Sequence, residues 1–138
     1  MNRLRCLPAT VLVFSLFSPA VVFAEEAPVP CKVLTAEEWG KVVGSAVTAI
    51  PGDMNCSYDG KASGGQLRIL AVSASEAQAR SVAARYASAL PGTPGEHTAL
   101  IDSKGRVVFS IALFQDEVTP KTSIQLQALL AAVKRNLK

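Results

Sequence analysis

The chain has 138 residues, of which 49% are hydrophobic and 18% are charged. Fourteen basic and eleven acidic residues give a net charge of +3, which is too small to indicate a nucleic-acid-binding protein. No CxxC, CxxCH, HExxH or glycine-rich phosphate-binding motif is present, so we expect no metal and no cofactor.

Residues 1–24 have the three parts of a secretory signal peptide. Arg3 and Arg5 form a basic start, and an apolar segment opens at residues 11–17. The positions that a signal peptidase reads end at Ala24, directly before two glutamates. We therefore expect cleavage after Ala24 and a mature protein in the periplasm or the extracellular medium.

Two kinds of membrane attachment are alternatives to cleavage. A transmembrane anchor needs roughly 20 unbroken apolar residues, but Pro19 interrupts this run. Lipid attachment needs a cysteine directly after the apolar segment, whereas Cys6 precedes that segment and Cys31 lies well beyond it. The mature chain is therefore expected to be soluble, without membrane insertion. Loss of Arg3 and Arg5 would leave twelve basic and eleven acidic residues, a net charge of +1.

The cysteines fit export. Cys6 would leave with the signal peptide, so Cys31 and Cys56 would remain in an oxidising compartment. A metal site or a pair of reactive thiols is the alternative. The long spacing without a nearby histidine is a poor metal pattern, so we expect a structural disulfide between Cys31 and Cys56.

A short arm at residues 25–30 is expected to lead into a single α+β domain at residues 31–138. Thr35 and Glu38 have the spacing of a capping box, and Trp39 occupies the hydrophobic-staple position after it. These residues predict a helix that ends near Gly44. Residues 46–50 are expected to add a further helical turn.

Alternating apolar residues and turn residues then predict two hairpins, each followed by a helix. In chain order we expect strands at 53–58 and 66–73, a helix at 74–90, strands at 97–102 and 106–114, and a last helix that begins near Thr119. The expected fold is α+β, with helices on a four-stranded antiparallel sheet and the element order α-β-β-α-β-β-α.

His97 is the only histidine and the only residue that suggests acid-base chemistry. With Glu96 or Asp102 as its partner, it could serve a small hydrolase-type enzyme. No nucleophile motif surrounds it, and a triad or a metal site needs several groups. We therefore favour a loop residue without a catalytic role, and we expect no catalytic residues.

The two strands predicted at 66–73 and 106–114 are apolar on both faces, although a sheet that is solvated on one side should alternate cleanly. Either the first helix covers the second face, or a partner binds there or a dimer forms through it. If a partner binds, the candidate surface is made of Arg68, Leu70, Val72, Val108, Ser110, Ala112 and Phe114.

Two short segments carry a resemblance to known proteins. Cys31-Lys32-Val33-Leu34-Thr35 begins the first helix, Gly44 follows that helix, and Cys56-Ser57-Tyr58 places an aromatic after the second cysteine. This pattern, spread over residues 31–90, resembles a family of small exported or lipid-anchored envelope domains of unknown function. The resemblance implies a cysteine-bridged α+β domain and no established catalytic residues.

Together these features predict a non-enzymatic periplasmic or secreted domain that binds a protein or a small ligand through its sheet surface or the loop at 91–97. An inhibitor or immunity-type protein that blocks an envelope enzyme is a narrower alternative, since small size, export and one disulfide suit it. The partner is expected to be an envelope protein or a small ligand, not a nucleic acid.

Overall fold

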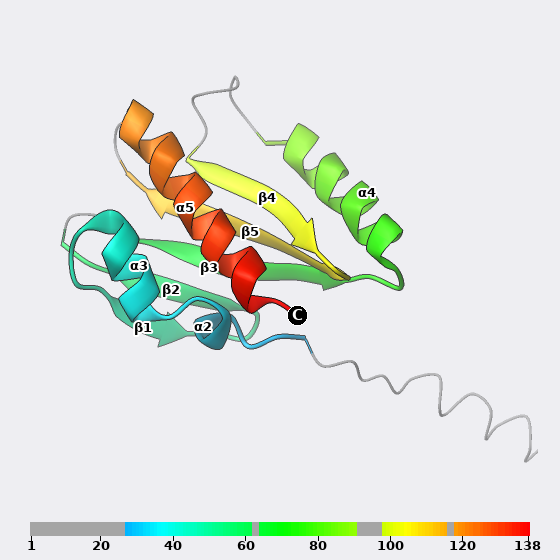
Figure 1. The fold of residues 1–138 in the computed structure, drawn as a ribbon, viewed down its shortest axis with the longest axis horizontal. Helices are drawn as coiled ribbons and strands as arrows, with labels where there is room; N and C mark the ends of the chain where they lie inside the picture. Colours follow the sequence, from blue (N-terminus) through cyan, green and yellow to red (C-terminus); the bar gives the residue numbers. More distant parts are fainter. Residues whose placement is uncertain (1–26, 62–63, 91–97, 116–117) are drawn as a thin grey trace, which may run out of the picture.

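Five antiparallel strands form one sheet in the order β1-β2-β3-β5-β4 (Figure 1). The structure, a computed structural model, describes residues 27–61, 64–90, 98–115 and 118–138. The strands are β1 (Thr48–Pro51), β2 (Asn55–Asp59), β3 (Gly64–Val72), β4 (Ala99–Lys104) and β5 (Val107–Phe114). The helices are α2 (Pro30–Val33), α3 (Ala36–Val43), α4 (Glu76–Ser88) and α5 (Pro120–Asn136). The expected signal peptide and its cleavage site lie outside the described residues.

The α+β class and the antiparallel sheet are confirmed, but the prediction of four strands is wrong. The missed strand is β1, which overlaps the segment 46–50 that was expected to be a helical turn and extends to Pro51. Gly44 adopts a left-handed conformation with φ 81° and ends α3, so the chain leaves the helix there. The β-branched residues Thr48 and Ile50 then pair with Asp59 and Ser57 of β2, because pairing outweighs the weak local preference.

The start of α3 is as the sequence predicts. The Glu38 amide donates to Thr35 Oγ1 at 3.2 Å, and the Thr35 amide donates to Glu38 Oε1 at 3.4 Å. These two bonds form the capping box. Leu34 and Trp39, on either side of the capping residue, are both fully buried. The first turn of the helix is therefore held by hydrogen bonds on its exposed side and by apolar contacts on its buried side.

One face of the sheet carries the main core, covered by α2, α3 and α5 (Figure 1). Trp39 of α3 stacks on Tyr58 of β2, with ring centroids 4.1 Å apart. Cys31 of α2 forms a disulfide with Cys56 of β2, which confirms the predicted pairing. We call this the covered sheet face. Its fully or almost fully buried strand residues are Cys56, Tyr58, Leu67, Ile69, Phe109, Ile111 and Leu113.

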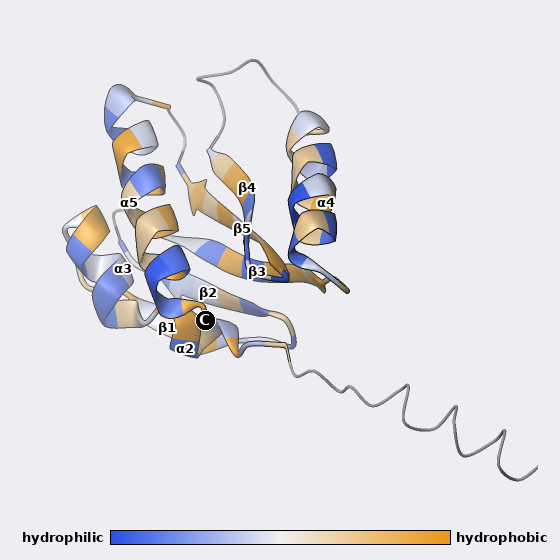
Figure 2. Cartoon of the chain, turned by 45° about the vertical axis from the view of Figure 1, so that its right-hand side comes forward, coloured by the Kyte–Doolittle hydropathy of each residue, from blue (hydrophilic) through white to orange (hydrophobic). Residues whose placement is uncertain are grey.

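The opposite face is partly covered by α4. Ala79 and Ala83 of α4 are buried against Val108 of β5 and contact Leu70 and Ala71 of β3. The small side chains of Ala79 and Ala83 allow this packing. Figure 2 shows hydrophilic residues, in blue, along α4. The expectation that the first helix lies over this face is wrong, because the Trp39–Tyr58 stack holds α3 on the covered sheet face.

The last helix ties the two ends of the domain together. Asn136 Nδ2 donates to the Val33 carbonyl at 2.8 Å, and Lys134 Nζ lies 2.7 Å from Asp102 Oδ2. Pro120 occupies the first turn of α5, as predicted for a helix that begins after Thr119. The helix thus contacts α2 near the disulfide and the edge strand β4 at the other side of the sheet.

Candidate functional site

The predicted partner surface is divided by the structure. Leu70 and Val108 lie under α4, and Val108 is fully buried there. Val72 is on the wrong face: a β-bulge between Ile69 and Ala71 shifts the register, so that Val72 pairs with Val107, whose side chain packs on the covered sheet face. These three residues are therefore removed from the partner surface.

The other four predicted residues stay together. Arg68 pairs with Ser110, and Gly64 pairs with Phe114, while Ala112 lies between the two pairs. Because side chains alternate along a strand, Ser110, Ala112 and Phe114 all point away from the core that holds Ile111 and Leu113. This part of the predicted surface is an uncovered strip of sheet, and it continues across β3 and β2 to β1, the strand that the sequence analysis missed.

The strand register extends this strip across the sheet. Ala112 pairs with Gln66, Gln66 with Ser57, and Ser57 with Ile50, which places one residue from each of β5, β3, β2 and β1 in a row. The row spans roughly 14 Å at about 4.8 Å per strand. We use the name open sheet face for the following part of this surface: Ile50, Ser57, Gln66, Arg68, Ser110, Ala112 and Phe114.

Ile50, Ser57 and Gln66 were missed by sequence reasoning. Ile50 could be found only by recognising β1, whereas Ser57 and Gln66 alternate with Cys56 and Leu67 and could be placed from that alternation. In the described part of the chain, α4 covers the neighbouring part of this face, and no helix packs over these residues.

The chemistry of the open sheet face is mixed. Phe114 is 62% exposed and Ile50 is 51% exposed, so two large apolar side chains meet solvent. Arg68 supplies the only charge among the seven residues and is also exposed. The seven residues include no carboxylate, thiol or imidazole, but Asp59, two residues after Ser57 on β2, lies on the same side of the sheet and is exposed.

Of the three residues proposed for the enzyme alternative, only Asp102 lies within the described residues. His97 and Glu96 lie outside the described residues. Asp102 is engaged elsewhere: Oδ2 pairs with Lys134, and Oδ1 accepts the Ser103 amide at 2.7 Å. Both oxygens of the carboxylate are therefore already bound within the domain.

Electrostatic interactions near the disulfide have a structural role. Burial alone would raise the pKa of the Glu38 carboxyl, but hydrogen bonds from Asn136 and Thr35 and the charge of Arg135 outweigh it and lower this pKa. Burial and the charge of Glu38 raise the pKa of Tyr58, whose hydroxyl donates to the Leu34 carbonyl at 2.5 Å. Tyr58 thus stays protonated and holds α2 and α3 to the sheet.

Several concave regions occur among the described residues, and two of them adjoin strands of the sheet. The first, of about 510 Å³, is lined by Ser45, Ala46 and residues 59–61. The second, of about 280 Å³, lies between α4 and β4 and is called the α4–β4 groove. Its lining residues are Arg80, Ala83, Ala84, Ala87, Ile101, Asp102 and Ser103.

Within the described residues, no group of three or more His, Cys, Asp or Glu side chains could hold a metal ion. In the same part of the chain, no helix has the length and hydrophobicity needed to cross a membrane. The chain matches no family model, no curated protein and no solved structure.

Proposed function

We propose that this protein is an exported, non-enzymatic interaction domain that binds another envelope or secreted protein through the open sheet face. The observation that carries the proposal is the exposure of Phe114 beside Ala112 on strand residues that no described helix covers. A solvated sheet face normally presents polar side chains, so an exposed aromatic side chain such as Phe114 is typical of a contact surface.

The partner is inferred from the chemistry of this surface. Side chains on one face of a sheet form a broad surface, which suits a protein better than a small molecule, since small ligands occupy concave pockets. Arg68 would form an ion pair with a carboxylate of the partner, and Phe114 would pack against an apolar side chain of the partner. Ser57, Gln66 and Ser110 can supply hydrogen bonds around them.

Export is part of the proposal. The signal peptide at residues 1–24 and the Cys31–Cys56 disulfide both fit an oxidising compartment. The resemblance to small envelope domains agrees with this location. The mass of the protein recovered from the envelope or medium tests it: the expected mature chain begins at Glu25 and has both cysteines oxidised, whereas an intact leader or alkylatable thiols would contradict export and bridging.

Binding is tested with matched substitutions. Phe114→Ser should weaken capture of the partner by roughly tenfold or more, because exposed aromatics often contribute most of the binding energy. Ile124→Ser is the control, since Ile124 is 70% exposed but lies on α5. The captured protein is identified by mass, prepared in pure form and titrated against wild type and both variants. Equal affinity for all three would overturn the open sheet face as the binding surface.

A further inference from the structure

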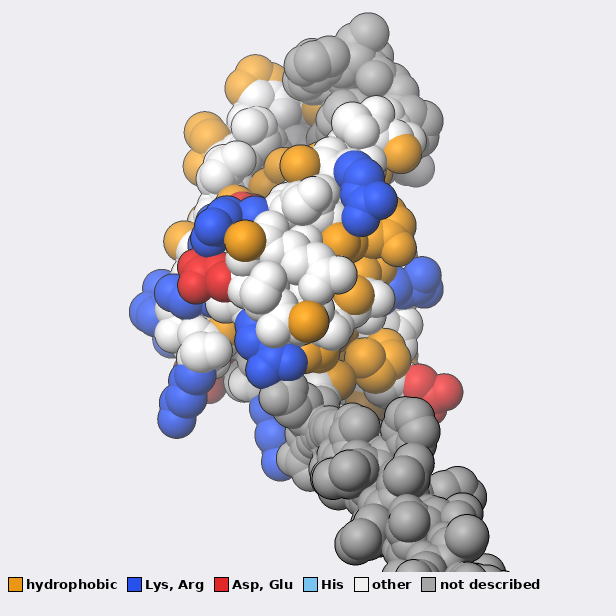
Figure 3. All heavy atoms as spheres, turned by 90° about the vertical axis from the view of Figure 1, so that its right-hand side faces the viewer, with side chains coloured by type: hydrophobic (Ala, Val, Ile, Leu, Met, Phe, Trp, Pro, Cys, Tyr) orange, Lys and Arg blue, Asp and Glu red, His pale blue; other side chains and the backbone are white. Residues whose placement is uncertain are grey.

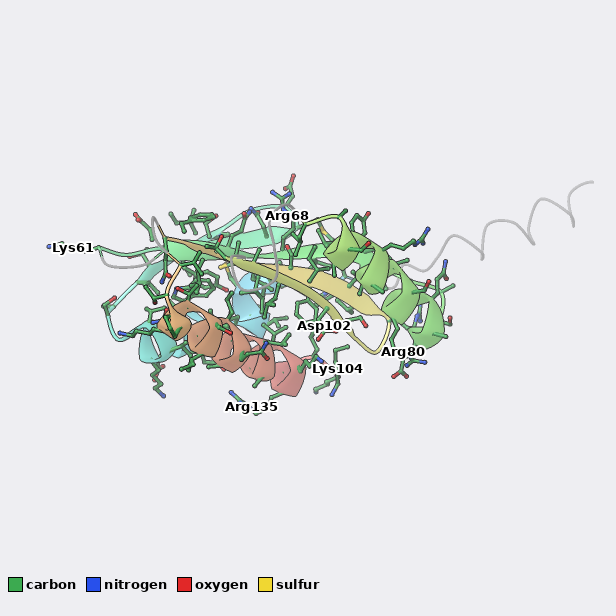
Figure 4. The ribbon with its side chains drawn as sticks, turned by 90° about the horizontal axis from the view of Figure 1, so that it is seen from above. Lys61, Arg68, Arg80, Asp102, Lys104 and Arg135 are labelled. Atoms are coloured by element: carbon green, nitrogen blue, oxygen red, sulfur yellow. A yellow bond between two sulfur atoms is a disulfide. The ribbon has the colours of Figure 1, made fainter. Side chains whose placement is uncertain are left out.

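Two opposite charges lie on the uncovered side of the sheet without an ion-pair partner in the described part of the chain. Arg68 of β3 and Asp59 of β2 are both exposed, and none of the ion pairs among the described residues includes either of them. Figure 4 shows Arg68 projecting from the side of the sheet opposite to α3 and α5. Asp59 points to the same side, because Tyr58 before it packs on Trp39 of α3.

The strand register keeps these two charges apart. Asp59 lies beside Gly64, because Tyr58 pairs with Gly65, and Arg68 follows Gly64 on β3. Four residues at about 3.4 Å and one strand spacing of about 4.8 Å put the two Cα atoms roughly 14 Å apart. The two side chains therefore cannot pair within one chain, but a second molecule could bring an acid to Arg68 and a base to Asp59.

We propose that the protein bound by the open sheet face is a second copy of this chain, related by a half-turn that pairs Arg68 of each copy with Asp59 of the other. This inference rests on the proposed function, since it names the occupant of the same surface. A closed two-fold dimer uses one patch twice, so a single complementary pair of charges forms two ion pairs. Complementary charges also set the orientation in which two surfaces meet.

The register fixes the axis of this half-turn. The axis lies between the two sheets and passes over the Ser57–Gln66 pair, which is midway between Asp59 and Arg68. It must be perpendicular to the line that joins the two charges, and this line is inclined by about 20° to the strands. The strands of the two copies therefore cross at about 40°, close to the roughly 30° at which aligned sheets pack face to face.

The same half-turn agrees with the apolar side chains and with the position of α4. Phe114, which pairs with Gly64, would lie close to Ala112 of the other copy, whose small side chain leaves room for the ring. Helix α4 packs on Val108, beyond the Arg68 end of the face, so each α4 would lie beyond the Asp59 end of the other copy. In Figure 3 the open sheet face lies toward the right-hand margin, where hydrophobic side chains gather and basic and acidic side chains project among them.

The size of the surface sets the expected affinity. Four strands and five residue positions cover roughly 19 Å by 17 Å in projection, which is less than the roughly 800 Å² that each partner contributes to a standard interface. We therefore expect a reversible dimer with a dissociation constant of roughly 100 μM. Sedimentation equilibrium of the purified exported protein, from about 10 μM to about 1 mM, should show the mass rising from one chain toward two.

Charge reversal tests the pairing itself. Arg68→Asp and Asp59→Arg, each alone, place like charges together at both ion pairs and should weaken dimer formation by about tenfold or more. An equimolar mixture of the two variants restores both pairs and should form a mixed dimer within about threefold of the wild-type affinity. Lys121→Asp, an equal charge change at an exposed position of α5, is the matched control and should leave the dimer unchanged.

If one reversed variant does not fold, the double variant Arg68→Asp/Asp59→Arg decides, because its copies regain both pairs and should dimerise like the wild type. A wild type that stays monomeric at about 1 mM, or a dimer that neither reversal weakens, would overturn the second copy as the occupant. In either case the proposed function stands if a different protein is captured and Phe114→Ser weakens that capture. Loss of both the dimer and any capture that depends on Phe114 would end both proposals.

Discussion

Trp39 stacks on Tyr58 with an interplanar angle of 8°, and the edge of the indole lies directly over Gly65 of β3. A Cβ atom at position 65 would lie 2.5 Å from Trp39 Cζ2 and 2.1 Å from the Ala112 carbonyl oxygen. The stack therefore requires glycine beneath it. This contact joins α3, β2 and β3, whereas the disulfide joins α2 to the same strand β2.

Gly65→Ala should destabilise the fold by about 3 kcal/mol, because the backbone oxygen and the packed indole cannot both move away. Gly44→Ala is the control: no atom lies within 4 Å of its Cβ position, and only the left-handed conformation opposes it, at about 1 kcal/mol. Urea unfolding of both variants measures the difference. Similar midpoints would show that the indole does not lie over Gly65.

Loss of the Cys31–Cys56 bridge should lower the free energy of unfolding by about 3 kcal/mol, since the bridge restricts the unfolded chain. The comparison is thermal unfolding of the wild type with and without reductant. The double variant Cys31→Ser/Cys56→Ser serves as the control, because reductant has no bond to break in it. A wild-type midpoint that does not fall on reduction would contradict a stabilising bridge.

Glu38→Gln should destabilise the protein near neutral pH by roughly 1 kcal/mol, because the amide is a weaker acceptor for Asn136 and Thr35. The folded state lowers the Glu38 pKa below its ordinary value of 4.5, so its stabilisation is complete above that value and is lost as pH falls through the folded-state pKa. The wild type and Glu38→Gln should therefore converge in acid.

Unfolding midpoints of these two proteins across the acid range measure this convergence. Glu37→Gln is the matched control, since Glu37 makes only an exposed ion pair with Lys41 at 3.5 Å. A constant gap between wild type and Glu38→Gln at every pH would show that the carboxylate charge does not hold α5 to α3.

Ala83→Leu should destabilise the fold by about 2 kcal/mol, because Ala83 is buried where α4 approaches the sheet at Val108. Ala84→Leu, one residue later on the exposed side, should change stability by less than about 0.5 kcal/mol. Chemical unfolding distinguishes them. Equal effects would indicate that α4 does not pack on this face through Ala79 and Ala83.

Local signals in the sequence were sufficient for much of the fold. Thr35 and Glu38 marked the start of α3, and Cys31 and Cys56, the two cysteines outside the predicted signal peptide, indicated the bridge. The helix start depends on residues that are close in sequence, and the disulfide was predicted by elimination. The strand β1 depends instead on pairing with β2, which the tetrapeptide Thr48–Pro51 does not encode by itself.

The candidate site was predictable only in part for the same reason. Arg68, Ser110, Ala112 and Phe114 were placed correctly by alternation along their strands. Val72 was assigned to the wrong face because alternation fails at a β-bulge. The residue types from Ile69 to Val72 do not predict a bulge. Val108 is covered by α4 rather than by the first helix, and this arrangement depends on tertiary packing.

The central claim is that the open sheet face binds a partner protein, and in-cell photocrosslinking tests it most directly. A photoreactive phenylalanine analogue is placed at Phe114 in one strain and at Ile124 in another, both large, apolar and exposed positions. The account predicts one crosslinked partner from position 114, lost when Arg68→Glu is added, and none from position 124. Equal crosslinking at both positions, or none at 114, would contradict it.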